Sequence, residues 1–212
     1  MELLVNEPKS LSSITFILAH GAGAPMDSEF MEAFAKGIAE NGFRCVRFEF
    51  PYMNERRKKL NKRPPDKLDN LIHSWKSVIN QFRGETLVIG GKSMGGRIAS
   101  LIADDSGVLA TILLGYPFIT KKNILEERIG HLRKIITPTL ICQGTRDKMG
   151  TYQAINRIKL SKSIKFHWAV DGDHSLIPLK RSIVSKEENW NLALLKITQF
   201  VSDIKQKSNK II

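Results

Sequence analysis

Hydrophobic residues gather along the chain in short runs that alternate with amphipathic segments. Several runs are apolar on both faces and rich in β-branched residues, as is typical of strands that are buried on both sides. They cover residues 13–20, 44–50, 86–91, 108–117, 137–144 and 163–170. Strands of this kind in alternation with helices predict a mostly parallel sheet covered by helices on both faces. We therefore expect an α/β fold in three layers.

Apolar residues at helical spacing predict the helices between these strands. The expected helices cover residues 28–42, 68–82, 94–103 and 189–205. In the first of them Phe30, Phe34 and Ile38 share one face, and Gly42 is the expected C-cap. Residues 51–67 are basic and broken by prolines, and they are interpreted as a connection.

The length and composition fit a single globular domain. The chain has 212 residues, of which 42% are hydrophobic and 25% charged, and this is enough for a three-layer core. No internal repeat or low-complexity linker marks a boundary. We expect one domain over residues 1–212, with its core at about 13–205 and a frayed basic tail at 205–212.

The chain shows no membrane span, because no window reaches the roughly 18 apolar residues that a span requires. Its first ten residues lack a basic leader followed by an apolar run, so no signal peptide is expected. Cys45 and Cys142 each lie inside a predicted strand and lack the spacing of a metal site. We interpret them as reduced, buried thiols of a cytoplasmic protein.

The formal net charge is +12, and the sequence pI is about 9.8. Such a charge is compatible with binding to nucleic acid, an anionic lipid or an anionic substrate. The alternative is a lysine-rich surface without such a partner. The basic residues run from Lys9 to Lys210 without interleaved aromatics or a nucleic-acid motif. Nucleic-acid binding is therefore not expected as the main function.

Residues 85–100, ETLVIGGKSMGGRIAS, contain two overlapping patterns. GKS ends a phosphate-binding P-loop, whereas G-K-S-M-G is a G-x-S-x-G turn that presents a nucleophilic serine. A P-loop requires a glycine five positions before Gly91, and the chain has Thr86 there. Residues 86–89 are also strand-like rather than loop-like, so the P-loop interpretation fails.

The same segment has the order that a nucleophile elbow requires, which is an apolar strand, a sharp turn and a helix. The serine of such an elbow is strained, so the positions two before and two after it must be small. Gly91 and Gly95 occupy those positions around Ser93. Ser93 would then lie at a helix N-terminus, where the dipole favours a developing anion. We predict Ser93 as the nucleophile, with a plain turn as the alternative.

A serine nucleophile needs a histidine base that a carboxylate orients, and in this architecture the chain order is serine, acid, histidine. Among the five histidines, only His174 has that order and a position just after the last predicted strand. Asp147, in the turn TRDKMG after the strand 137–144, is the expected acid. The alternatives are an exposed loop histidine at His174 and a helix N-cap at Asp147.

The other candidates for base and acid are assigned no catalytic role. His20 precedes the nucleophile at another strand end, and His167 lies inside a predicted strand. Two further histidines are expected on the surface of helical segments: His73 and His131. The remaining acid candidates, Asp171 and Asp173, lie too close to His174 along the chain to orient its ring.

An oxyanion formed during acyl transfer needs two N–H donors. One is expected from the backbone of Met94, directly after the nucleophile, and the other from Ala22 in the turn HGAGAP. Gly21 and Gly23 would let this backbone approach the serine. A dinucleotide fingerprint is not indicated, because its third glycine falls on Met26.

Several segments together resemble the α/β-hydrolase fold. They are HGAGAPMDSEFM, FEFPYM, NKRPPDK, GGKSMGGR, QGTRDKMG and DGDHSL. The chain looks like a small, lid-poor branch of predicted bacterial hydrolases related to dienelactone hydrolases and to a testis-expressed animal relative. The resemblance covers residues 14–200 and implies Ser93 as nucleophile, Asp147 as acid and His174 as base. The turn DKMG departs from the branch, in which a proline or small residue is expected next.

Two local features bear on the substrate. Only about twenty residues separate the strands 108–117 and 137–144, where lidded hydrolases insert a cap domain, so we expect an open site without a sizeable cap. A basic run follows the strand 44–50 and comprises Arg56, Arg57, Lys58, Lys59, Lys62 and Arg63. We hypothesise that Arg57 and Arg63 hold an anionic part of the substrate. The alternative is a solvated basic loop.

These features predict a serine hydrolase that cleaves an ester, thioester or similarly activated acyl bond of a small molecule. No metal or organic cofactor is expected to take part. One alternative is a catalytically weak binding or scaffold protein that keeps the fold and uses its basic surface. Another is an acyltransferase. The order of Ser93, Asp147 and His174 along the chain favours the enzyme.

Overall fold

The computed structural model describes residues 2–59, 63–119 and 126–209. Lys62 of the basic run and residues 210–212 of the expected tail lie outside the described residues. The last helix continues to Asn209, so residues 205–209, which we expected to fray, are helical.

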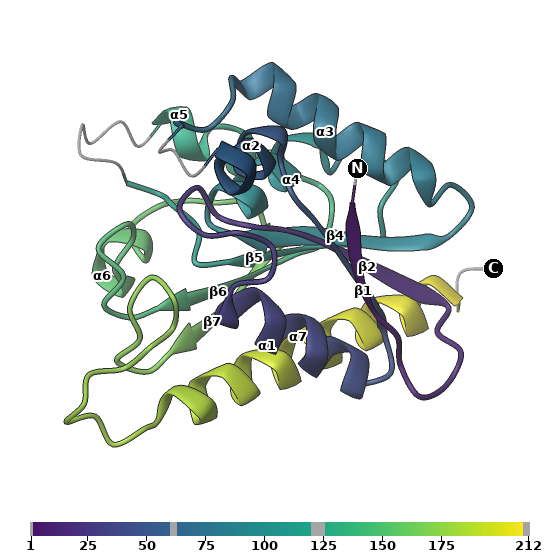
Figure 1. The fold of residues 1–212 in the computed structure, drawn as a ribbon. Coiled ribbons are helices and arrows are strands. Elements are labelled where there is room, and N and C mark those ends of the chain that lie inside the picture. Colours follow the sequence, from purple (N-terminus) through teal and green to yellow (C-terminus); the bar gives the residue numbers. More distant parts are fainter. Residues whose placement is uncertain (1, 60–62, 120–125, 210–212) are drawn as a thin grey trace.

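Seven strands form one sheet in the order β1-β3-β2-β4-β5-β6-β7 (Figure 1). They are β1 (Leu3–Asn6), β2 (Ile14–Ala19), β3 (Arg44–Phe48), β4 (Thr86–Lys92), β5 (Ala110–Leu114), β6 (Thr139–Gly144) and β7 (Ile164–Ala169). Neighbouring strands pair in parallel except for β1, which pairs antiparallel with β3. The predicted mostly parallel sheet is confirmed. The edge strand β1 was not predicted, because its four residues are partly exposed and give too short a hydrophobic pattern.

Helices cover both faces of the sheet. They are α1 (Glu29–Glu40), α2 (Pro51–Lys59), α3 (Leu68–Gln81), α4 (Met94–Ile102), α5 (Glu126–Ile129), α6 (Tyr152–Ile155) and α7 (Lys186–Asn209), with a 3₁₀ turn η1 (His131–Arg133). Figure 1 shows α1 and α7 side by side under the sheet, and α3 and α4 above it. The three-layer architecture is confirmed.

Helix α2 lies within the segment that was interpreted only as a connection. Its sequence, PYMNERRKK, has no apolar face, and only Tyr52 and Met53 are buried. Pro51 stands at the first helical position, where a missing N–H costs nothing and the fixed φ suits the helix. Pro51 therefore begins α2, whereas β3 already ends at Phe48.

The core has two main parts, one on each side of the sheet. On β2, Phe16 and Leu18 pack toward α1 and α7, whereas Ile17 and Ala19 pack toward α3 and α4. This is the two-residue alternation of a pleated strand. The strand runs are apolar throughout because helices bury both faces.

The carboxyl ends of parallel strands meet at one edge of the sheet, where sites of α/β proteins form. The turns after β2, β4, β6 and β7 therefore come together. Between β5 and β6 the described residues form only α5 and η1, so this part of the structure holds no sizeable cap domain. Within the described ranges, no helix is long and apolar enough to cross a membrane.

The two cysteines are free and fully buried, as predicted. Burial raises the pKa of the Cys45 thiol to about 12, and it also raises the pKa of Cys142. Since the thiolate is the reactive form, both residues act as small apolar core side chains.

Candidate active site

Ser93 lies in the sharp turn between β4 and α4. Its backbone has φ 50° and ψ −111°, a region that non-glycine residues rarely adopt. The strand and helix approach so closely that a Cβ on Gly95 would lie 2.5 Å from the carbonyl oxygen of Ala19. Gly91 has φ 148°, and a Cβ there would lie 2.0 Å from the same oxygen. The small residues predicted around Ser93 are thus required by backbone packing.

Ser93, His174 and Asp147 form one hydrogen-bonded series. Nε2 of His174 lies 2.9 Å from Oγ of Ser93, and Nδ1 of His174 lies 2.7 Å from Oδ2 of Asp147. An ionised Asp147 accepts from Nδ1–H, which leaves Nε2 to accept the serine proton. Asp147 is fully buried, whereas the His174 side chain is 31% exposed. The buried Asp147 therefore orients the imidazole, and the ring remains partly open to a substrate.

Two further groups fix the carboxylate of Asp147. Nε2 of Gln143 donates to Oδ2 at 2.6 Å, and the N–H of Met149 donates to Oδ1 at 2.8 Å. Gln143 is fully buried at the end of β6, and its Oε1 accepts the N–H of Tyr116 at 2.7 Å. These two donors hold the carboxylate oxygens in a fixed orientation toward His174. The sequence reasoning missed Gln143, which it counted only as part of a strand.

The N-cap interpretation of Asp147 is wrong. The N-cap of α6 is Thr151, whose Oγ1 accepts the N–H of Ala154 at 3.3 Å. The segment DKMG departs from the family pattern but still forms a regular turn. In this turn the N–H of Gly150 donates to the carbonyl of Asp147 at 2.9 Å.

The loop that carries His174 is held by its own acidic residues. Oδ1 of Asp173 accepts the backbone N–H groups of Ser175 and Ile177 at 2.7 and 3.0 Å. Asp171 pairs with Arg146 at 2.7 Å. Both aspartates are structural, in agreement with their exclusion as the acid.

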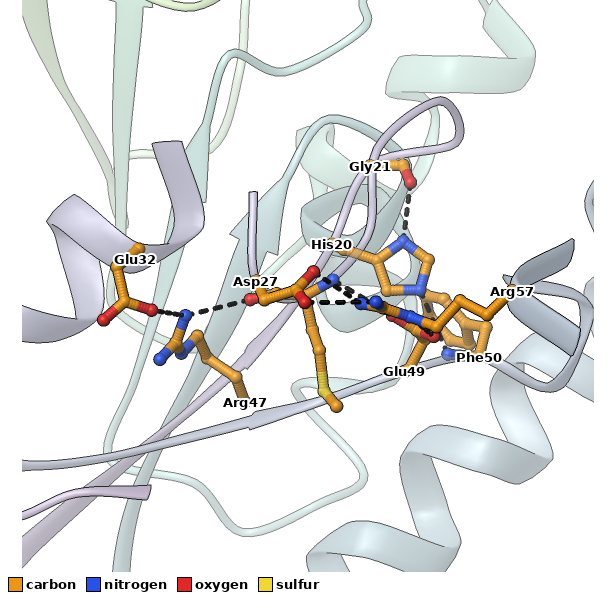
Figure 2. A network of polar contacts seen from close by, with 9 residues as sticks. His20, Gly21, Asp27, Glu32, Arg47, Glu49, Phe50 and Arg57 are labelled. Carbon is orange, nitrogen blue, oxygen red and sulfur yellow. Dashed lines mark hydrogen bonds and ion pairs between the residues drawn. The ribbon is translucent and has the colours of Figure 1, made fainter. Parts of the chain in front are cut away.

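His20 supports the turn that was predicted to bind the oxyanion. Its Nε2 accepts the N–H of Phe50 at 3.1 Å, so the ring proton is on Nδ1 and is donated to the carbonyl of Gly21 at 2.7 Å (Figure 2). Burial lowers the pKa of His20, which keeps the ring neutral. The sequence analysis assigned His20 no role. Its position at the end of β2, directly before the glycine turn, could have indicated that it supports this turn.

Met94 directly follows Ser93, and the turn that carries Ala22 lies against the nucleophile. A Cβ added to Gly21 would lie 3.6 Å from Cβ of Ser93, which puts this turn against the nucleophile. The carbonyl of Ala22 accepts from the Tyr52 hydroxyl at 3.1 Å and thereby fixes the orientation of the turn. Within the described ranges, the N–H groups of Ala22 and Met94 donate to no protein acceptor.

The structure does not bring Arg57 and Arg63 to the nucleophile. Nε of Arg57 lies 2.6 Å from Oε1 of Glu49, and its Nη1 lies 3.0 Å from Oδ2 of Asp27 (Figure 2). Arg63 pairs with Glu55, and with Asp66 at 3.1 Å. Local carboxylates neutralise both guanidinium groups, and neither side chain lines the pocket above Ser93.

Of the remaining histidines, His73 is exposed on α3 as expected. The surface prediction for His131 is wrong, because this ring is partly buried and its Nε2 lies 2.8 Å from Oγ of Ser100. Burial lowers its pKa to about 4. His167 lies inside β7, where it was placed.

A pocket of about 480 Å³ opens above the nucleophile. Ser93, His174 and Lys92 line it together with the glycine turn after β2. Its walls are mainly apolar and include Phe30, Met31, Met149, Ile177 and Trp190. The volume suits a small acyl group, and the walls suit its hydrocarbon part.

Comparison with known proteins agrees with the fold. Residues 12–202 match the family model described as an alpha/beta hydrolase domain. A serine hydrolase without a lid from Xanthomonas campestris superimposes with a TM-score of 0.68 at 17% identity, over 97% of this chain and 88% of that one.

Two further solved structures are similar. Est1E from Butyrivibrio proteoclasticus has a TM-score of 0.72 at 14% identity, over 96% of this chain and 94% of its own. A dienelactone hydrolase from Anabaena variabilis has a TM-score of 0.66 at 17% identity, over 97% and 90% of the two chains. At these identities the likeness shows the fold, and it confirms the resemblance seen in the sequence motifs.

Proposed function

Because the chain belongs to the alpha/beta hydrolase family, we propose that it is a serine hydrolase that cleaves an ester, thioester or similarly activated acyl bond of a small substrate. The observation that carries the proposal is the hydrogen-bonded series of Ser93, His174 and Asp147 beneath an open pocket. Family membership supports hydrolase activity in general, and this series supports acyl transfer through a serine nucleophile.

In the proposed reaction, Oγ of Ser93 attacks the substrate carbonyl while Nε2 of His174 takes its proton. The negative charge that develops on the carbonyl oxygen is stabilised by the N–H groups of Met94 and Ala22. His174 then protonates the leaving group, and a water molecule activated by the same imidazole releases the acid. Asp147 holds the neutral imidazole in the reactive tautomer and stabilises the imidazolium that forms when the ring takes the proton.

The shape of the pocket supports a small acyl group. The pocket is about 480 Å³ and mainly apolar, and the described residues place no cap above it, so the leaving group can extend into solvent. Est1E has been described with ferulic acid bound, and other similar structures are described as a dienelactone hydrolase and a membrane phospholipase A. The fold alone therefore does not select the acyl substrate.

The scaffold alternative is disfavoured on energetic grounds. A scaffold has no need of a serine held at φ 50°, since such a backbone costs on the order of 1–3 kcal/mol. Nor does it need a fully buried carboxylate aimed at a half-exposed imidazole. Both features are explained by catalysis.

The test is steady-state hydrolysis of 4-nitrophenyl acetate, butyrate and octanoate by the wild type, Ser93→Ala and Asp147→Asn. We expect Ser93→Ala to fall to the background rate. Asp147→Asn should lose roughly 10⁴-fold in kcat with little change in KM, because the imidazole then takes the wrong tautomer. Circular dichroism establishes that each variant is folded. A Ser93→Ala variant as active as the wild type would overturn the proposal.

A further inference from the structure

Lys92 is the last residue of β4 and directly precedes the nucleophile. It is only 9% exposed, and it lines the same pocket as Ser93 and His174. Its Nζ lies 5.3 Å from the ring centre of Phe30 on α1. The ammonium group is therefore buried near Phe30, a residue of the apolar pocket wall, and it lies close to Gly115, where an added Cβ would be 2.9 Å from Nζ.

The charge of this ammonium is largely uncompensated. Nζ donates to the carbonyl oxygen of His174 at 2.6 Å, and this is its one hydrogen bond to the described residues. None of the ion pairs among the described residues includes Lys92. The undescribed positions contain no Asp or Glu. Two of the three donors of the ammonium thus have no acceptor among the described residues.

A buried cation without a paired anion is costly, and proteins keep such groups mainly where a ligand or a reaction uses them. Asp147 and Asp173 attract Lys92 only at longer range. The pocket rim also holds Glu29, but Lys186 pairs with that carboxylate at 2.6 Å. Among the described residues that line the pocket, Lys92 is the only cationic lysine or arginine.

We propose that Lys92 binds a carboxylate on the acyl part of the substrate, so that the enzyme prefers short anionic acyl esters to neutral esters of the same shape. The inference rests on the proposed function and specifies its substrate class. A carboxylate would accept the free donors of Lys92 in a site of low dielectric, where charge-assisted hydrogen bonds are strong. The anionic substrate first suggested by the arginines Arg57 and Arg63 is thus reassigned to a lysine inside the pocket.

The contacts of His174 favour a short acyl chain. Nζ of Lys92 contacts the carbonyl of His174, and the ring of that same residue contacts Oγ of Ser93 at 2.9 Å. One residue, His174, therefore contacts both the ammonium and the nucleophile. Half-esters of succinic, glutaric and adipic acid place a carboxylate within a few carbons of the ester carbonyl and differ in chain length.

The experiment compares the monoethyl esters of these three acids with the neutral amides that replace the carboxylate, by pH-stat titration at pH 7. The proteins are the wild type, Lys92→Met, Lys92→Arg and the control Lys36→Met. Lys36 is a lysine of α1 whose side chain is exposed and does not line the pocket, so its replacement removes the same charge from the surface.

For at least one chain length we expect the wild type to prefer the acid over the amide in kcat/KM. Lys92→Met should lower kcat/KM for the acid by about 10- to 100-fold relative to the amide, the range for a hydrogen bond to a charged group. Lys92→Arg should keep part of the preference, and Lys36→Met should keep all of it. If Lys92 only positions His174, both substrates lose equally and the ratio stays unchanged, which overturns the inference.

The experiment distinguishes a failure of the proposed function from a failure of this inference. If the wild type hydrolyses the amides without preferring any acid, the function stands and the inference fails. If it hydrolyses neither, calorimetry decides with 5-oxohexanoate and 5-oxohexanamide, the methyl-ketone counterparts of a glutarate ester and its amide. Tighter binding of the acid that Lys92→Met abolishes supports the inference, and equal binding of the two ketones overturns it.

Discussion

Replacing Lys92 by methionine should make the protein more stable at neutral pH, although this lysine lines the pocket. Burial lowers the pKa of Lys92 from 10.5 to about 8. A shift of that size corresponds to roughly 3 kcal/mol by which burial disfavours the charged form at pH 7. Methionine has a similar length and shape without the charge, so it leaves no cavity.

The lost hydrogen bond to the carbonyl of His174 opposes this gain by about 1 kcal/mol. We therefore expect Lys92→Met to raise the free energy of unfolding by about 2 kcal/mol at pH 7. The gain should shrink as the pH rises from 8 toward 10.5, because the folded wild type releases its proton near pH 8 while the unfolded chain keeps it to about pH 10.5. In that window the wild type gains stability with pH relative to the variant.

Urea unfolding followed by circular dichroism at pH 7, 8, 9 and 10 measures this difference. All other titrating groups are shared by the two proteins, so the pH dependence of their difference reports Lys92. A difference that stays constant from pH 7 to 10 would show that the burial of this ammonium is not costly. A variant less stable than the wild type at pH 7 would also refute the reasoning.

Two further predictions concern the backbone and the acid. Gly95→Ala should destabilise the protein by several kcal/mol in urea unfolding, because its Cβ would lie 2.5 Å from the carbonyl oxygen of Ala19. Gly23→Ala, whose Cβ meets nothing within 4 Å, should change stability by less than about 0.5 kcal/mol. Gln143→Leu should lower kcat for 4-nitrophenyl butyrate by about 10- to 100-fold with little effect on KM, because Asp147 loses a donor that positions it. Equal activity of Gln143→Leu and the wild type would remove that positioning role.

The sequence was sufficient for the features that local pattern controls. Apolar runs located the central strands because helices bury both faces of the sheet. Ser93, Asp147 and His174 were found because each follows a strand, and parallel strands end at one edge. Once the strands are known, the juxtaposition of these three residues follows from topology.

Side-chain contacts that depend on how turns and helices fold together could not be predicted from the sequence. Arg57 was assigned to the substrate because its partners, Glu49 and Asp27, become visible only when α2 folds against the turn after β2. Gln143 and Lys92 were read as the end of a strand and the variable position of a motif. Their importance comes from contacts made across 4 and 82 residues of chain.

The most direct test of the account is labelling of the purified protein with a fluorophosphonate probe, which reacts with an activated serine. The matched control is Ser77→Ala, which replaces an exposed serine on α3. We expect the wild type and Ser77→Ala to be labelled, and Ser93→Ala and His174→Ala to be unlabelled. A folded wild type that does not react, or labelling that persists in Ser93→Ala, would contradict the claim that Ser93 is a nucleophile activated by His174.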